Sequence, residues 1–180
     1  VADRFDTAPG ALDRAARDAA TGAPAGPRGR YAYSDVNYLL LGAIVEETTD
    51  RPFADTLRYQ VLAPMGLSHT GATADTPRTS GHRLWWGRWR AFEPGHDDSG
   101  APYGYVVSTL DDLDRYAAAH QSGAGLPLTA AHREAMQSRQ ADTGTDSAGR
   151  PMWYGFGWRG GDLTGHRIVE HTGATPGFFS

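Results

Sequence analysis

The sequence contains no cysteine and no lysine, and it has no long uninterrupted hydrophobic segment. Without cysteine, the chain cannot form disulfides, use a thiol nucleophile or bind a metal through thiolates. Its 17 basic residues are all arginine. Because a guanidinium stays protonated, none of them can replace a lysine as a base or an amine nucleophile. The lack of an apolar run of about 20 residues excludes a typical transmembrane helix within these 180 residues.

The residues that are present describe a loop-rich globular chain with a small negative charge. It has 23 glycines, 11 prolines and 39% hydrophobic residues, which is untypical of a coiled coil or a disordered tail. The net charge of −4, with no basic stripe that stands out, argues against a nucleic-acid partner. No signal peptide is visible, and both ends stop within recognisable patterns, so we expect a chain truncated at both ends.

Three helices are predicted within the first 70 residues. Residues 9–20 suit an amphipathic helix that begins near Pro9. Residues 36–48 are apolar around most of the helix circumference, so we expect that helix to be buried on several sides. Asp50 and Pro52 are expected to cap and open the next helix.

Residues 71–102 lack a clear period, which is typical of a functional segment or of one packed over another element. This region contains the sequence LWWGRW. Trp85, Trp86 and Trp89 could line a binding cleft, but we favour aromatic packing over the helical region.

Two further helices are predicted after this region. Thr109 is expected to cap the first, with Asp112 as the acidic partner of a capping box, and Gly123 is expected to end it. The predicted apolar stripe of this helix consists of Leu110, Leu113 and Ala117. Thr129 is expected to cap the second helix.

The last 40 residues change to a strand pattern. Residues 141–150 are interpreted as a polar loop, and MWYGFGW (152–158) and HRIVEHTG (166–173) as strands joined by the turn GGDLTG. The predicted fold class is therefore α/β, of the α+β type. We expect a helical region over residues 1–150 and antiparallel strands over residues 151–180.

Most familiar catalytic and cofactor motifs are missing. The seven histidines form no HExxH motif and no i, i+4 pair on a predicted helix, so no metal site is predicted. The sequence also lacks a GxGxxG turn, a P-loop and a correctly spaced G-x-S-x-G elbow. We therefore expect no cofactor.

Two short motifs remain that could carry chemistry, Tyr33-Ser34-Asp35 and His171-Thr172-Gly173. With their surroundings they resemble the β-lactamase-like serine hydrolases, which include class C β-lactamases, D-alanyl-D-alanine carboxypeptidases and related esterases. The sequence around YSD resembles the Tyr-x-Asn motif of this family, and PYGYVVSTLDDLDRYAAAH resembles its Gly-rich turn before a capped helix. WYGFGW and VEHTGATPGF resemble the strand pair that ends in Lys-Thr-Gly or His-x-Gly. The resemblance implies a β-lactamase/transpeptidase-like fold, here the helical region plus a remnant antiparallel hairpin of the main sheet.

The resemblance also implies roles for individual residues. Tyr33 is the candidate general base, although a phenol with a pKa of about 10 needs a nearby positive charge to act as one. His171 takes the place of the lysine in the third motif, where it could bind a substrate carboxylate or donate to the tyrosine oxygen. Thr172 and Gly173 would contact substrate, and the backbone N–H of Ala174 would be one oxyanion donor.

Asp35 departs from the family pattern, because it stands where the motif usually has asparagine. It could be a plain helix N-cap, a site residue or both. An ionised carboxylate keeps an acceptor for a lysine but has no donor for an acylamino substrate. This departure argues against turnover of β-lactams.

The nucleophile of the family belongs to a Ser-x-x-Lys motif, which a chain without lysine cannot contain. Three interpretations stay open: part of an acyl-enzyme hydrolase whose serine and lysine lie outside this chain, a degenerate relative that binds a peptidoglycan-like ligand, or a small scaffold domain. The expected partner is a small-molecule or peptide substrate, together with the remainder of the fold. The sequence does not define an oligomeric state, and only the resemblance favours an extracellular or cell-envelope location.

Overall fold

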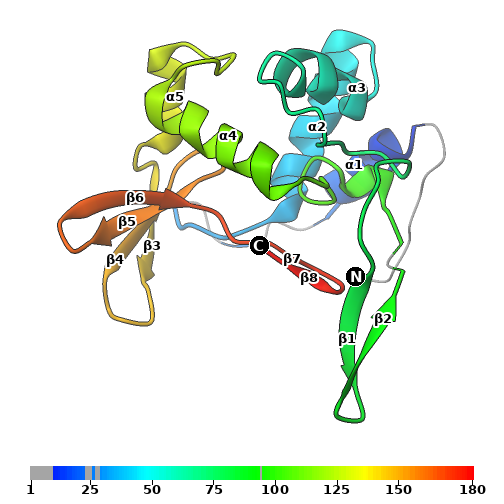
Figure 1. Ribbon diagram of the computed structural model, residues 1–180. Coiled ribbons are helices and arrows are strands. Elements are labelled where there is room, and N and C mark those ends of the chain that lie inside the picture. Colours follow the sequence, from blue (N-terminus) through cyan, green and yellow to red (C-terminus); the bar gives the residue numbers. More distant parts are fainter. Residues whose placement is uncertain (1–9, 23–25, 27–28, 94) are drawn as a thin grey trace.

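The computed structural model describes residues 10–22, 26, 29–93 and 95–180. In this part of the chain, two groups of helices are separated by a pair of strands, and the remaining strands follow the second group (Figure 1). The helical elements are α1 (Ala11–Ala20), α2 (Asp35–Thr49), α3 (Phe53–Leu57), η1 (Arg58–Leu62), η2 (Asp98–Gly100), α4 (Leu110–Ser122) and α5 (Ala130–Gln137). The strands are β1 (Gly81–Trp85), β2 (Arg88–Phe92), β3 (Ala141–Thr145), β4 (Pro151–Tyr154), β5 (Arg159–Leu163), β6 (His166–Glu170), β7 (Ala174–Thr175) and β8 (Phe178–Phe179).

The apolar core of the helical region lies between α1 and α2. Leu12, Ala16 and Leu39 form its buried centre, and Phe53 at the start of α3 packs against it. Gly42 of α2 allows Pro102 and Leu12 to lie close to the backbone of this helix, because a Cβ there would lie 2.3 Å from Pro102 and 3.2 Å from Leu12. The predicted helices over residues 9–20 and 36–48 are confirmed from Ala11 and Asp35 onward, while Pro9 lies outside the described residues.

The expectation that α2 is buried on several sides is wrong for the described part of the chain. Only Leu39 and Gly42 of this helix are buried, whereas Leu41 and Ile44 are more than half exposed. The predicted role of Asp50 is also wrong. Asp50 ends α2 in the left-handed conformation, with φ of 52°, and Pro52 alone precedes α3.

Residues 71–102 contain a β-hairpin that the sequence pattern did not predict. β1 and β2 pair antiparallel around a turn at Trp86 and Gly87, both of which have positive φ. Asparagine, aspartate and glycine are the usual residues of such turns. Because Trp86 is none of these, the sequence did not indicate a turn here. The predicted packing of Trp85, Trp86 and Trp89 over the helical region is wrong, since all three side chains are exposed.

Helix α4 begins and ends as predicted but buries a different face. The Thr109 hydroxyl accepts a hydrogen bond from the backbone N–H of Asp112, and Gly123 ends the helix with φ of 80°. The predicted stripe of Leu110, Leu113 and Ala117 is exposed. Asp112 is fully buried instead, where it accepts hydrogen bonds from the His69 backbone N–H and the Thr70 hydroxyl, both at 2.8 Å.

Hydrogen bonds to Asp112 therefore join α4 to the segment that follows η1. Burial alone would raise the pKa of this carboxyl, but the donors at Thr70 and His69 lower it below its ordinary value. The cap of α5 is simpler and follows the prediction, since the Thr129 hydroxyl accepts from the backbone N–H of His132.

Four antiparallel strands form the sheet, in the order β3-β4-β5-β6. The prediction of strands near residues 152–158 and 166–173 is confirmed in outline, but the predicted turn GGDLTG is mostly strand β5, which lies between β4 and β6. The predicted loop over residues 141–150 is wrong, because Ala141–Thr145 form β3. The sheet thus begins before residue 151, and the division of the chain into regions 1–150 and 151–180 stays a prediction.

The two glycines of β5 explain why its sequence was predicted to form a turn. A Cβ at Gly160 would lie 2.0 Å from the Trp153 ring, and one at Gly161 would lie 2.6 Å from the Met152 sulfur. Large side chains of β4 therefore cover the backbone of β5. This packing needs glycine in a strand interior, where glycine is otherwise unfavourable.

Gly155 provides a test of how the sheet packs against α5. A Cβ at this position would lie 2.2 Å from the Met136 carbonyl oxygen and 2.9 Å from that of Ser138, so backbone atoms would have to move. We expect Gly155→Ala to lower the free energy of unfolding by about 1–3 kcal/mol, the usual effect of overpacking. Chemical denaturation measures this change.

Gly104→Ala is the matched control, because no heavy atom lies within 4 Å of a Cβ there and its φ is not in the left-handed region. It is expected to change stability by less than about 0.5 kcal/mol. Equal stability of the two variants would contradict the described packing of Gly155 against α5.

Candidate active site

The structure brings the two predicted motifs together. Tyr33 lies in the extended segment before α2, and His171 follows the last residue of β6. Their ring centroids are 6.4 Å apart, and Tyr33 is the same distance from Tyr154 of β4. The start of α2 and the end of β6 therefore face each other, although 137 residues separate Tyr33 from His171 in sequence.

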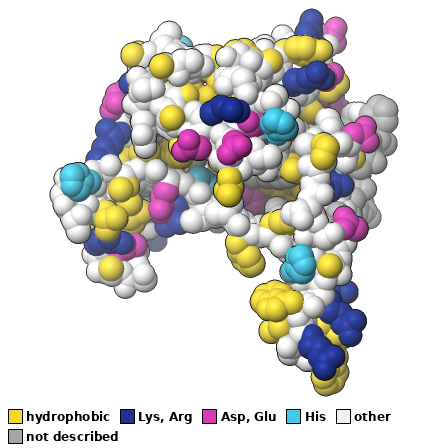
Figure 2. Space-filling model, viewed as in Figure 1, with side chains coloured by type: hydrophobic (Ala, Val, Ile, Leu, Met, Phe, Trp, Pro, Cys, Tyr) yellow, Lys and Arg dark blue, Asp and Glu magenta, His cyan; other side chains and the backbone are white. Residues whose placement is uncertain are grey.

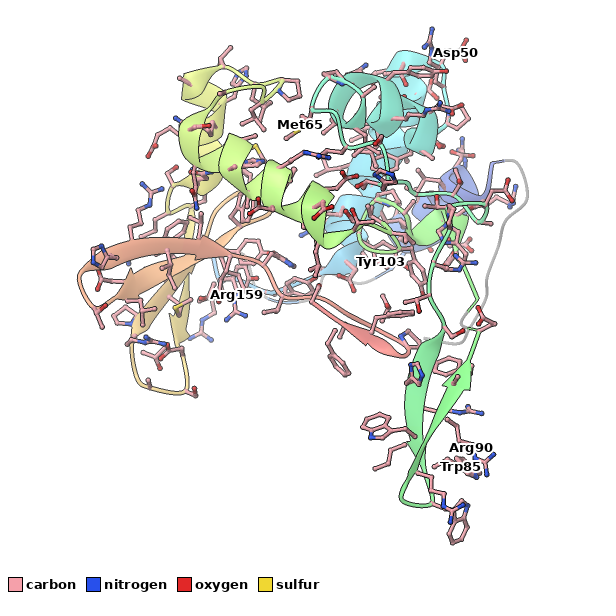
Figure 3. All side chains as sticks on the ribbon, in the orientation of Figure 1. Asp50, Met65, Trp85, Arg90, Tyr103 and Arg159 are labelled. Atoms are coloured by element: carbon pink, nitrogen blue, oxygen red, sulfur yellow. The ribbon has the colours of Figure 1, made fainter. Side chains whose placement is uncertain are left out.

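A cavity of about 360 Å³ lies where these segments meet. This volume is within the usual range of small-molecule sites. Tyr33, His171 and Thr172 line the cavity, together with residues from before α2 and from three strands of the sheet: Tyr31, Thr143, Thr145, Met152 and Arg159. Arg159 lies close to the point where β5 and β6 approach the helices (Figure 3).

A hydrogen bond between Tyr154 and His171 holds the histidine at the cavity. The phenol oxygen lies 2.7 Å from Nε2 of the imidazole. Tyr154 is only 7% exposed, and its ring contacts that of Tyr31 with centroids 5.2 Å apart. Because Tyr154 sits in the middle of the sheet and His171 follows its edge strand, this bond joins the third motif to the sheet interior.

The protonation of Tyr154 indicates the direction of this hydrogen bond. Burial, followed by the neighbouring phenols of Tyr31, Tyr38 and Tyr33, raises the pKa of Tyr154 far above its ordinary value. The phenol therefore keeps its proton at any working pH, and we assign it as the donor to Nε2. A neutral His171 then carries its own proton on Nδ1.

The Tyr33 phenol is also protonated near pH 7, because its pKa is raised. The residue is 56% exposed, but burial of part of its side chain raises its pKa, and a hydrogen bond and the negative charge of Asp35 raise it further, to about 12. The main contributions to this shift all raise the pKa. Tyr33 would therefore need a nearby positive charge to act as a base near pH 7.

Asp35 is the first residue of α2, and Ser34 occupies the N-cap position. The interpretation of Asp35 as the N-cap is therefore wrong. Ser34 itself makes no side-chain capping bond. The Asp35 carboxylate instead interacts with the Tyr33 phenol, and its charge in the first turn is favourable at a helix N-terminus.

The residues after His171 run into a short hairpin. Gly173 and Ser180 exchange both backbone hydrogen bonds, at 2.9 and 3.0 Å, and Ala174 pairs with Phe179. Because hydrogen-bonded pairs alternate along an antiparallel ladder, the N–H of Ala174 is directed to the opposite edge of β7. This direction is compatible with the predicted oxyanion donor, whereas the substrate contacts of Thr172 and Gly173 stay predictions.

Several residues of the candidate site had no sequence signal. Tyr154 of β4 lies opposite Arg159 of β5. This pairing could not be predicted, because the sequence from Gly160 was interpreted as a turn and not as strand β5. Thr143 and Thr145 come from β3, which was interpreted as a loop. Tyr31 lies two residues before Tyr33, where alternation along an extended segment places both on one side.

The described residues contain no metal-binding group and no membrane-spanning helix. No cluster of three or more histidine, cysteine, aspartate or glutamate side chains there could hold a metal ion. No helix in the same part of the chain has the length and apolar character needed to cross a bilayer.

Helices combined with an antiparallel sheet, and a Tyr–His cavity where they meet, match the fold of penicillin-binding proteins and class C beta-lactamases. A family model described as Beta-lactamase matches residues 2–180, so this chain belongs to the beta-lactamase family. This finding confirms the resemblance noted in the sequence and the predicted fold class.

Individual relatives agree with this assignment. The unguisins hydrolase ungD' of Aspergillus campestris is 28% identical over 163 residues, which cover 84% of this chain. The octameric penicillin-binding protein homologue from Pyrococcus abyssi superimposes with a TM-score of 0.77 at 18% identity over 96% of the chain. D-amino acid amidase from Ochrobactrum anthropi, in complex with L-phenylalanine, gives a TM-score of 0.72 at 22% identity over 98% of the chain.

The chain spans only part of each of these proteins. It covers 30% of the unguisins hydrolase, 40% of the penicillin-binding protein homologue and 51% of the amidase. The similarity to the two solved structures establishes the fold alone.

The titration of Tyr33 tests the interaction with Asp35. We expect the Tyr33 phenol to titrate near pH 12 and Asp35→Asn to lower its pKa, because the variant removes a negative charge that favours the neutral phenol. Burial, the largest cause of the shift, is expected to keep the pKa above its ordinary value. NMR of chains with ¹³C-labelled tyrosine measures the titration, and the resonance missing from Tyr33→Phe identifies the residue. An unchanged Tyr33 pKa in Asp35→Asn would show that the carboxylate does not act on the phenol.

The tautomer of His171 tests the bond from Tyr154. In ¹⁵N NMR spectra at a pH where the imidazole is neutral, we expect the proton on Nδ1 in the wild-type chain. Tyr154→Phe removes the donor, so the proton is expected to move at least partly to Nε2. Tyr116→Phe, which removes a partly buried phenol elsewhere, serves as the control. A wild-type proton on Nε2 would contradict the assigned direction.

Proposed function

We propose that this chain is the part of a serine hydrolase that carries its tyrosine and histidine, and that the complete enzyme forms an acyl-enzyme on an ester, an amide or a D-alanyl-type peptide. The observation that carries the proposal is the position of Tyr33 and His171 on one cavity in a chain of the beta-lactamase family. Hydrolase and amidase names among the relatives support the same reaction class.

The nucleophilic serine and its lysine are proposed to lie outside this chain. The chain contains no lysine, and it covers 30–51% of the relatives described above. The protonated state of Tyr33 supports this arrangement. An ammonium group brought next to the phenol would lower its pKa and allow it to accept the proton of the attacking serine.

Tyr33, His171 and Ala174 then each have a chemical role in the proposed reaction. Tyr33 transfers the proton between the serine and the leaving group. His171, fixed by Tyr154, presents its Nδ1–H as a donor, either to the substrate or to the Tyr33 oxygen. The N–H of Ala174 donates to the oxyanion that forms on the attacked carbonyl.

The charges around the cavity indicate the kind of substrate. Arg159 lines the cavity and is charged at every working pH, so it can bind a substrate carboxylate in a bidentate manner. Asp35 offers only acceptors next to Tyr33, which disfavours a substrate that presents a carbonyl there. These features favour a peptide or ester with a free carboxylate over a β-lactam with an acylamino side chain.

Labelling with a fluorophosphonate tests where the nucleophile lies. Mass spectrometry is expected to show one phosphonylated serine in the complete protein, in a Ser-x-x-Lys sequence, and no adduct within these 180 residues. An adduct on a serine of this chain would overturn the assignment of roles. A complete protein without an adduct that still binds D-alanyl peptides would instead indicate a relative that binds without catalysis.

Tyr33→Phe tests the proton-transfer role. In the complete enzyme, hydrolysis of p-nitrophenyl acetate is expected to fall by about 10²- to 10⁴-fold in kcat, the usual contribution of a general acid–base group. Tyr59→Phe is the matched control, since the two tyrosines are 56% and 57% exposed and Tyr59 lies outside the cavity lining. Equal kcat values for the two variants would exclude Tyr33 from proton transfer.

A further inference from the structure

The β1–β2 hairpin, residues 81–92, carries an unusual set of exposed side chains. Figure 1 shows the hairpin projecting from the body of the molecule, and Figure 2 shows hydrophobic and basic side chains gathered along it. Trp86 at the turn is 91% exposed, and Trp89 and Leu84 are also mostly in solvent. Exposed apolar groups concentrated in this way are typical of a binding surface.

The register of the hairpin divides its side chains between two faces. Leu84 pairs with Trp89 on one face, next to the pair of His82 and Ala91. The other face carries the remaining pairs, in which Arg83 lies opposite Arg90 and Trp85 lies opposite Arg88. One face is therefore apolar and the other combines arginines with an indole, while Trp86 occupies the tip.

The charge of the hairpin is opposite to that of the chain. Residues 81–92 contain Arg83, Arg88 and Arg90 and no acidic residue, whereas the whole chain has a net charge of −4. Within the described part of the chain, none of these arginines forms an ion pair with a carboxylate. Arg83 instead lies over the rings of Trp85 and Phe92, at 5.7 and 5.3 Å.

We propose that the hairpin binds the surface of an anionic lipid bilayer. The indoles of the tip and of the apolar face would enter the interfacial layer, where tryptophan is favourable, and the arginines would bind lipid phosphates. A bilayer surrounds an inserted loop and so contacts both faces and the tip together. A groove on a protein usually covers one face, which would leave either the apolar or the arginine face in solvent.

The base of the hairpin connects this surface to the rest of the fold. The His82 backbone N–H donates to the Gly177 carbonyl at 3.5 Å, and a Cβ at Gly177 would lie 2.8 Å from the Gly81 Cα. Gly177 is in the turn between β7 and β8, a few residues after His171. Lipid binding would therefore hold the candidate cavity at a set orientation to the membrane. The proposal itself does not depend on hydrolase activity.

Two variants separate the contributions of charge and of the indole. Arg88→Gln combined with Arg90→Gln removes two charges without touching Arg83, and Arg51→Gln combined with Arg58→Gln is the control with the same charge change on exposed residues elsewhere. Trp86→Asn removes the tip indole and creates an Asn-Gly turn, the preferred sequence for a tight hairpin. The hairpin should therefore stay folded in this variant.

Co-sedimentation of the complete protein with vesicles measures binding. We expect binding to phosphatidylcholine vesicles that contain about one-quarter phosphatidylglycerol and none to pure phosphatidylcholine. The hairpin double variant is expected to weaken binding by about 25-fold, at roughly fivefold per arginine, and the control double variant by much less. Trp86→Asn is expected to weaken it by roughly tenfold.

Three results would overturn the proposal. The first is the absence of binding to the anionic vesicles, as expected if another part of the complete protein covers the hairpin. The second is equal weakening by the two double variants, which would indicate a response to total charge. The third is concentration-dependent self-association that Trp86→Asn abolishes without any lipid binding, which would identify a second copy of the chain as the partner.

Discussion

The hydrogen bond between Tyr154 and His171 is the interaction on which the candidate site depends. His171 follows an edge strand and is exposed, so without this bond little would hold its ring over the cavity. Tyr154 is itself held by burial in β4 and by its contact with Tyr31. The same group of rings includes Tyr33, so the sheet positions both motifs at once.

This arrangement explains the division of electrostatic roles within the chain. Burial raises the pKa values of Tyr31, Tyr33, Tyr38 and Tyr154, and neighbouring phenols raise those of Tyr31, Tyr33 and Tyr154 further, so each favours its neutral form. Arg159 opposes this effect at Tyr31 and Tyr154. At Tyr33 the main contributions all raise the pKa. A catalytic phenolate at position 33 would consequently depend on a charge that the proposed lysine would supply.

Features that depend on neighbouring residues could be predicted from the sequence. The caps at Thr109 and Thr129 and the helix end at Gly123 each involve residues within one turn, and all three are confirmed. The meeting of Tyr33 and His171 was expected only because the motifs resemble a known family. Local patterns contain no information about contacts between such distant residues.

Features that depend on tertiary contacts were missed or misassigned. Gly160 and Gly161 resemble a turn, but the side chains of Trp153 and Met152 cover them within the sheet. Asp112 was predicted to be the acidic residue of a capping box. It is buried instead of the leucines of α4, because His69 and Thr70, which are distant in sequence, donate hydrogen bonds to its carboxylate. The hairpin turn at Trp86 could not be predicted, because a positive φ is unusual for an aromatic residue.

A crystal structure of the complete protein after reaction with a fluorophosphonate would test the proposed site directly. We expect a phosphonylated serine from outside these 180 residues, with its oxygen within hydrogen-bond distance of the Tyr33 phenol and a lysine ammonium beside both. A phosphonyl oxygen is expected to accept a hydrogen bond from the N–H of Ala174. An adduct remote from the cavity between Tyr33 and His171 would exclude the proposed roles of these two residues.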